Sequence, residues 1–208
     1  MLDVHAPHET IRGWKSFFIH IATITIGLLI AIGLEQTVVH IHRLHQLAEV
    51  RRELTIEVAQ NRRQLDTNRA AMQQLTAQLD ENMAALRAAQ ATHAAVGRRL
   101  EYEPKYAWPL DGAWQVAKQN GSLGLMPHEQ IRKYTYVYEG IAVLMVEMTE
   151  LAVKMRVANA IFRRAPDGKF TPRDLEELVS ATSELQARAA LVLEILHYED
   201  IGLKAAEG

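Results

Sequence analysis

An uncharged run near the N-terminus most constrains what this chain can fold into. The 19 residues from Ser16 to Leu34 include no aspartate, glutamate, lysine or arginine. A helix needs about 20 apolar residues to cross the hydrocarbon core of a bilayer, so this run is long enough. Trp14 and Lys15 precede it, and an indole ring and a snorkelling amine are both favourable at a membrane surface. The sequence therefore predicts an N-terminal tail over residues 1–15, a transmembrane helix over 16–39 and an extramembrane domain over 40–208.

Two other interpretations of this run are less favourable. A signal peptidase could cut at the triplet Ala31-Ile32-Gly33, but the run exceeds the usual length of about 7 to 15 residues and the tail carries Asp3 and Glu9. A helix that is apolar on all faces could also be buried in a soluble core, but it would need a large domain around it. A retained single span is the favoured interpretation.

Small and polar residues share one face of the predicted span. They are His20, Thr23, Gly27, Ala31 and Glu35. Small residues allow close approach of another helix, and a polar atom costs less against a protein than against lipid. One interpretation is a packing face for a second copy or another membrane protein. The other is that the threonine bonds its own backbone, His20 stays neutral and Glu35 lies among the headgroups.

The chain after the span has the pattern of a long heptad helix. Residues 34–96 contain no proline or glycine, so nothing obliges the transmembrane helix to end at the membrane surface. Apolar residues recur at a spacing of seven at Leu44, Val58, Leu65, Met72, Leu79 and Leu86, with Arg51 at the one gap, and the companion positions include Asn61, Asn68 and Asn82. Buried asparagine in a heptad costs stability and fixes register or partner, so these three residues are predicted to specify the bundle.

Two further helices complete the predicted fold. Pro127 is placed to open a helix that continues to about Arg164, and "APDGK" then reverses the chain. Thr171-Pro172 with Asp174 resembles a capping box at the start of the next helix. The predicted fold class is all-α, with a single N-terminal transmembrane helix that continues into an elongated antiparallel three- to four-helix, coiled-coil-like bundle.

The stretch between the long helices is rich in proline, tryptophan and glycine. Asp111 can cap a short helix through Lys118, which Asn120-Gly121 would end. Trp108 and Trp114 are candidates for a ligand pocket, but buried tryptophan in a small helical protein is more often packing.

Charge and motifs argue against several functions. A formal net charge of −2 gives no field for binding nucleic acid, and the absence of cysteine excludes disulfides and cysteine-based zinc sites. His42, His45 and Glu49 lie on one helix face and form a minor metal candidate, but interfacial histidine is the favoured interpretation and no HExxH motif occurs. No nucleotide-binding or hydrolase motif is present, so we expect no enzyme activity, cofactor or metal.

Two segments resemble an uncharacterised group of bacterial single-pass membrane proteins. They are "HETIRGWKSFFIHIATITIGLLIAIGLEQ" and "GAWQVAKQNGSLGLMPHEQIRKYTYVY", in which Ala113-Trp114, Gly121, Leu123 and Pro127 form the frame. The resemblance implies a membrane anchor and a helical outer domain, and it supplies no activity or catalytic residue.

These features predict a cellular localisation and a class of function. Arg12 and Lys15 lie close to the first flank of the span, which favours a cytoplasmic N-terminus and a periplasmic bundle at the bacterial inner membrane. The leading hypothesis is an interaction protein that binds itself or another membrane protein as a scaffold or accessory subunit. The alternative is an extracytoplasmic sensor whose bundle binds a small ligand.

Overall fold

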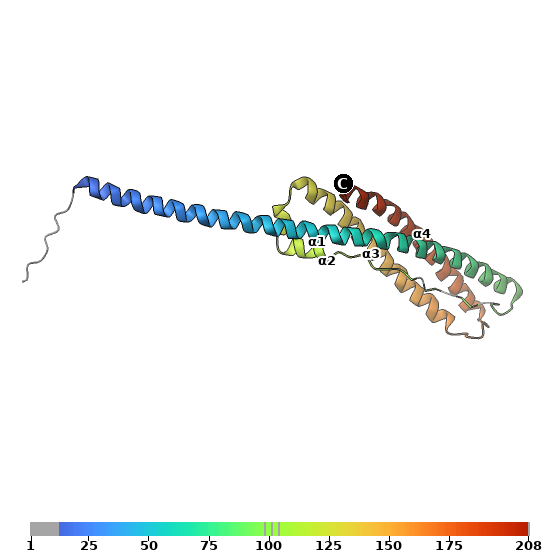
Figure 1. Ribbon diagram of the computed structural model, residues 1–208. Coiled ribbons are helices and arrows are strands. Elements are labelled where there is room, and N and C mark those ends of the chain that lie inside the picture. The colour runs from blue at the N-terminus through green and yellow to red at the C-terminus, as the bar shows by residue number, and fades with distance from the viewer. Residues whose placement is uncertain (1–12, 98, 101, 104, 208) are drawn as a thin grey trace, which may run out of the picture. The chain divides into compact units, whose positions relative to one another are not determined.

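The computed structural model describes residues 13–97, 99–100, 102–103 and 105–207 (Figure 1), so most of the predicted tail lies outside the described residues. Throughout these ranges the regular structure is helical, and they include no strand. The elements are α1 (Trp14–Thr92), α2 (Gly112–Gln119), the 3-10 turn η1 (Ser122–Leu125), α3 (His128–Phe162) and α4 (Pro172–Glu207). The predicted all-α class is confirmed.

The chain divides into two compact units, and the boundary falls inside α1. Unit 1 extends to Ala48 and unit 2 covers Glu49 to the C-terminus. Helix α1 runs through the boundary without interruption, as the lack of proline and glycine predicts. The compact unit thus begins at Glu49. The predicted boundary between transmembrane helix and extramembrane domain at residues 39 and 40 stays a prediction.

The core of unit 2 follows the predicted periodicity. Buried side chains on α1 recur at Val58, Leu65, Met72, Leu79 and Leu86, each 6 % exposed or less. Because apolar residues seven apart share one side of a helix, α1 presents a continuous apolar stripe to the rest of unit 2.

Helices α3 and α4 form an antiparallel pair, joined by a short turn and lying side by side (Figure 1). Ion pairs cross between them, with Lys154 Nζ 2.7 Å from Glu184 Oε1 and Arg188 Nη1 3.0 Å from Glu147 Oε2. The start of α4 has the predicted capping box, in which the Asp174 N–H donates to Thr171 Oγ1 over 3.1 Å.

Helix α3 runs in the same direction as α1. Arg51 Nε donates to Gln130 Oε1 over 3.1 Å, and further along both helices the Glu57 carboxylate accepts from the Tyr138 hydroxyl. Residue numbers therefore increase in the same direction along α1 and α3. Residues 105–127, the returning segment, run back along α1 before α3 begins, since Ala107 bonds to Asn68 and Leu110 to Asn61, and this explains the direction of α3. Only α4 is antiparallel to its two neighbours among the long helices described.

Candidate functional site

The apolar part of α1 in unit 1 is fully exposed in this chain. Its most apolar 18-residue window has a mean hydropathy of 2.3, and none of it is buried. Ile24 is 70 % exposed and Leu29 62 % exposed, and an exposed apolar surface of this extent marks a contact with protein or membrane. By length and composition, α1 could cross a membrane.

Two polar side chains of the stripe, His20 and Thr23, bond to the backbone of the helix itself. The His20 Nδ1–H donates to the Ser16 carbonyl over 2.9 Å, and Thr23 Oγ1 donates to the Ile19 carbonyl over 2.9 Å. These bonds match the second interpretation of the stripe, in which polar atoms need no partner. Gly27 has no side chain or remote backbone atom within 4 Å of where a Cβ would lie, so the stripe is uncovered. Its role in packing stays a prediction.

The metal candidate does not form a site. Among the residues described, no group of three histidine, aspartate or glutamate side chains is placed to hold a metal ion, so His42, His45 and Glu49 do not assemble as one. His42 Nε2 instead accepts a hydrogen bond from Gln46 Nε2 over 3.1 Å.

Two of the predicted specificity residues hold the returning segment rather than another helix. Asn61 Nδ2 donates to the Leu110 carbonyl and Asn61 Oδ1 accepts from the Leu110 N–H, both over 2.7 Å. Asn68 makes the same pair of bonds with Ala107, over 2.8 and 2.7 Å. Each side-chain amide therefore pairs with both backbone groups of one residue, as a neighbouring strand would. The third residue, Asn82, is fully buried further along α1.

A buried glutamate on the same face of α1 organises the start of α2. Glu57 is 8 % exposed, and its carboxylate accepts hydrogen bonds from the Ala113 N–H over 2.8 Å and the Trp114 N–H over 3.4 Å. The Tyr138 hydroxyl of α3 donates to the same carboxylate over 2.7 Å. Burial, followed by this carboxylate, raises the pKa of Tyr138, so the hydroxyl stays protonated and donates.

This arrangement corrects the predicted cap of α2. Asp111 occupies the N-cap position, but its side chain makes no cap hydrogen bond and instead accepts from Gln115 Nε2 over 2.7 Å. The carboxylate that satisfies the free N–H groups comes from Glu57 on α1, where it also complements the positive end of the helix dipole. A tertiary contact has replaced the local cap.

The two candidate pocket tryptophans have different environments. Trp114 is 7 % exposed, and its ring stacks on Tyr138 with centroids 4.9 Å apart and an interplanar angle of 3°. Trp108 is 45 % exposed and meets Tyr106 edge to face at 5.5 Å. Trp114 is therefore a packing residue, and neither ring lines the two cavities described next.

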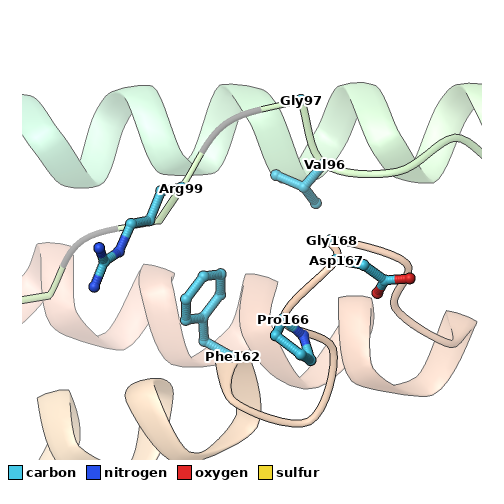
Figure 2. Close-up of a pocket in the computed structure, with 7 residues that line it drawn as sticks. All are labelled: Val96, Gly97, Arg99, Phe162, Pro166, Asp167 and Gly168. Carbon is cyan, nitrogen blue, oxygen red and sulfur yellow. The ribbon is translucent and has the colours of Figure 1, made fainter.

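An open cleft lies where the loop after α1 meets the turn between α3 and α4 (Figure 2). Its volume is about 540 Å³, and its lining residues are Val96, Gly97, Arg99, Phe162, Pro166, Asp167 and Gly168. Gly168 has φ +76°, its carbonyl accepts from the Val96 N–H over 2.9 Å, and a Cβ there would lie 2.8 Å from the Val96 carbonyl oxygen. The Arg99 and Asp167 side chains point to opposite ends of the cleft in Figure 2, so its polar groups do not converge.

A second, much smaller cavity lies between α1, α3 and α4. Its volume is about 10 Å³, and residues from all three helices line it, among them Gln64, Leu144 and Glu199. Glu199 is only 6 % exposed, and burial raises the pKa of its carboxyl group to about 7. Gln64 Oε1 and Glu199 Oε2 are buried without a hydrogen-bond partner among the described residues.

Comparison with known proteins adds nothing to these geometric findings. No family model, curated protein or solved structure matches the chain. The resemblance to bacterial single-pass membrane proteins therefore stays a prediction.

Sequence reasoning missed Glu57, Gln64, Tyr138 and Glu199. A signal for the first two was present, because Glu57, Asn61, Gln64 and Asn68 occupy one face of α1 at helical spacing. A polar stripe beside an apolar one indicates that a segment packs there whose backbone N–H and C=O groups need hydrogen-bond partners. No comparable pattern marks Glu199, which follows the exposed Tyr198 on α4.

Proposed function

We propose that this protein is a membrane-anchored helical bundle that acts without catalysis, as a scaffold or accessory subunit of a larger membrane complex or as a homo-oligomer. The observation that carries the proposal is the exposure of the whole apolar window of α1. Such a surface is unfavourable in water and favourable in lipid, because the hydrophobic effect removes apolar area from water. Unit 2 is then a folded domain tethered to the membrane through α1.

A second apolar surface supports an interaction role. Val143, Val146, Val153 and Val157 lie on one side of α3 and are 43–60 % exposed. Valine is a poorer helix former than alanine or leucine, so helix propensity does not account for four exposed valines on one face. An exposed apolar face of this kind favours a protein partner, either a second copy or another membrane protein.

The proposed address is the bacterial inner membrane, with unit 2 in the periplasm. The support is the charge next to the span, where Arg12 and Lys15 lie within a few residues of its first end. Positively charged residues close to a span are retained on the cytoplasmic side.

Enlarging the small-residue stripe is expected to weaken association in the membrane. Ala31→Leu places a bulky side chain on the stripe, and Ala22→Leu makes the same change on the opposite face of the helix. Native mass spectrometry of gently solubilised membranes should show the Ala31→Leu assembly reduced roughly fivefold, equivalent to about 1 kcal/mol. Ala22→Leu should match the wild type. A strictly monomeric wild-type particle, or equal effects of both substitutions, would count against the proposal.

The cysteine-free chain allows a clean test of orientation. Ser180→Cys introduces a single thiol at an exposed position of α4, in the predicted extramembrane domain. Gly13→Cys introduces one just before the first residue of the predicted span. A membrane-impermeant maleimide is expected to label Ser180→Cys in intact spheroplasts and to label Gly13→Cys only after lysis. The reverse pattern would place unit 2 in the cytoplasm, and labelling of both sites would refute a membrane span.

A further inference from the structure

Glu199 occupies a position that is unusual for a carboxyl group. The cavity that it faces is lined by the amides of Asn61, Gln64 and Asn68 on α1, by Pro109, and by aliphatic residues of α3 and α4. No charged side chain other than Glu199 lines it. An ionised carboxylate here has no cation to compensate its loss of hydration.

Nearby charges act on a different residue. Asp200, the next residue of α4, is 2.5 Å from Lys204 Nζ. Lys204 lowers the pKa of Asp200, with smaller contributions from Arg69 and Arg62 of α1, whereas burial alone shifts the pKa of Glu199. The positive charges of this region therefore stabilise Asp200 and leave Glu199 uncompensated.

The cavity has room for one bridging water. A cavity needs about 10–15 Å³ to hold a water molecule, and this one measures about 10 Å³. Gln64 Oε1 and Glu199 Oε2 are both acceptors when the carboxyl is ionised, so neither can donate to the other. Water alone could donate to both oxygens, but it would leave the full negative charge in place. A proton on Glu199 removes the charge and supplies the missing donor.

We propose that Glu199 is a buried proton-binding site, and that the contact between α3 and α4 tightens when Glu199 binds a proton and loosens when the proton leaves. In the protonated state the Glu199 hydroxyl donates toward Gln64 Oε1 through one bridging water, for which the cavity has room. Helices α1 and α4 are then joined at one point by a neutral hydrogen-bond chain, and the carboxyl group lies against α3.

Two glycines explain why ionisation would be transmitted to the helix contact. A Cβ on Gly140 of α3 would overlap Glu199 Oε1, so the carboxyl group lies directly against the α3 backbone. One turn further along α4, a Cβ on Gly202 would lie 3.0 Å from the Tyr136 ring. Because both contacts depend on close backbone approach, Glu199 cannot move toward water without separating α3 from the C-terminal turns of α4.

The sign of the pH dependence follows from proton linkage. A carboxyl group whose pKa is raised from 4.5 to about 7 on folding binds more protons in the folded state between these values. The contribution of this group to the free energy of unfolding is complete below pH 4.5 and is lost as the pH rises through about 7. The ratio of unfolded to folded protein should therefore increase by roughly 10²-fold between about pH 5 and pH 8.

The test compares the full wild-type chain in detergent micelles with two variants. The wild type should lose stability from about pH 5 to pH 8. In Glu199→Gln the ratio of unfolded to folded protein should change by less than about threefold over the same range. The exposed control Glu194→Gln should follow the wild type. Infrared difference spectra between wild type and Glu199→Gln should show a protonated carboxyl band at acid pH that vanishes as the pH passes neutrality.

Each outcome decides the proposal. Equal pH dependence of wild type and Glu199→Gln, or a wild type without a protonated carboxyl band at about pH 5.5, would overturn it. If Glu199→Gln fails to fold, the titration of the band in the wild type alone gives the answer, with the wild type at alkaline pH as its reference.

Discussion

The double substitution of Asn61 and Asn68 by leucine is expected to destabilise the bundle by about 3–5 kcal/mol. Each amide makes two hydrogen bonds to the backbone N–H and C=O of one residue of the returning segment. Leucine leaves the N–H and C=O groups of Ala107 and Leu110 without these partners, at a cost of about 1–3 kcal/mol for each fully buried group. Partial access of water to Leu110 and the better helix propensity of leucine offset some of this cost.

A coiled-coil role for Asn61 and Asn68 predicts the opposite change in the free energy of unfolding. If these asparagines were ordinary seam residues of a coiled coil, leucine would stabilise the bundle, because a polar seam residue is retained there at a cost in stability. Urea unfolding of the full chain in detergent distinguishes the two, with Thr67→Leu as a control on the exposed side of α1. The control should change the free energy of unfolding by less than about 0.5 kcal/mol.

The sequence predicted those parts of the fold that depend on local pattern. The length of α1, the capping box at Thr171 and the reversal at Gly168 each rest on residues close together in the chain. Periodic apolar residues determine which side of each helix is buried, so the core of α1 was also predictable.

The roles of single polar residues were not predictable in the same way. Asn61 and Asn68 were recognised as buried and specific, but a heptad pattern points to a facing helix and carries no information about a peptide segment some 40 residues further on. The prediction that Asp111 caps α2 was wrong for a related reason, because the Glu57 carboxylate of α1 accepts from the first N–H groups of α2 in place of the Asp111 side chain. Glu199 had no local signal, since its burial depends on Gly140 in another helix.

Removing the carboxylate that joins three elements of unit 2 is the other substitution with a large expected effect. Glu57→Ala should lower the free energy of unfolding by about 3–5 kcal/mol, because it leaves a cavity and removes the acceptor of the Tyr138 hydroxyl and of two N–H groups at the start of α2. The exposed Glu53, one turn earlier on α1, provides the matched control. Glu53→Ala should change stability by less than about 0.5 kcal/mol.

Glu57→Gln separates the hydrogen bonds from the packing. Glutamine keeps the volume and one acceptor oxygen, which can still bind the Ala113 N–H, while the Tyr138 hydroxyl can rotate to accept from the new amide. Two donors then lack an acceptor, the Tyr138 O–H and the Trp114 N–H with its longer bond of 3.4 Å, so the cost should fall to about 2–3 kcal/mol. Near-ultraviolet circular dichroism reports the stacked Trp114 and Tyr138 rings, and it should be retained in Glu57→Gln and reduced in Glu57→Ala. Equal losses in the two variants would mean that Glu57 acts through its volume, and the carboxylate would then have no special part in holding α2 between α1 and α3.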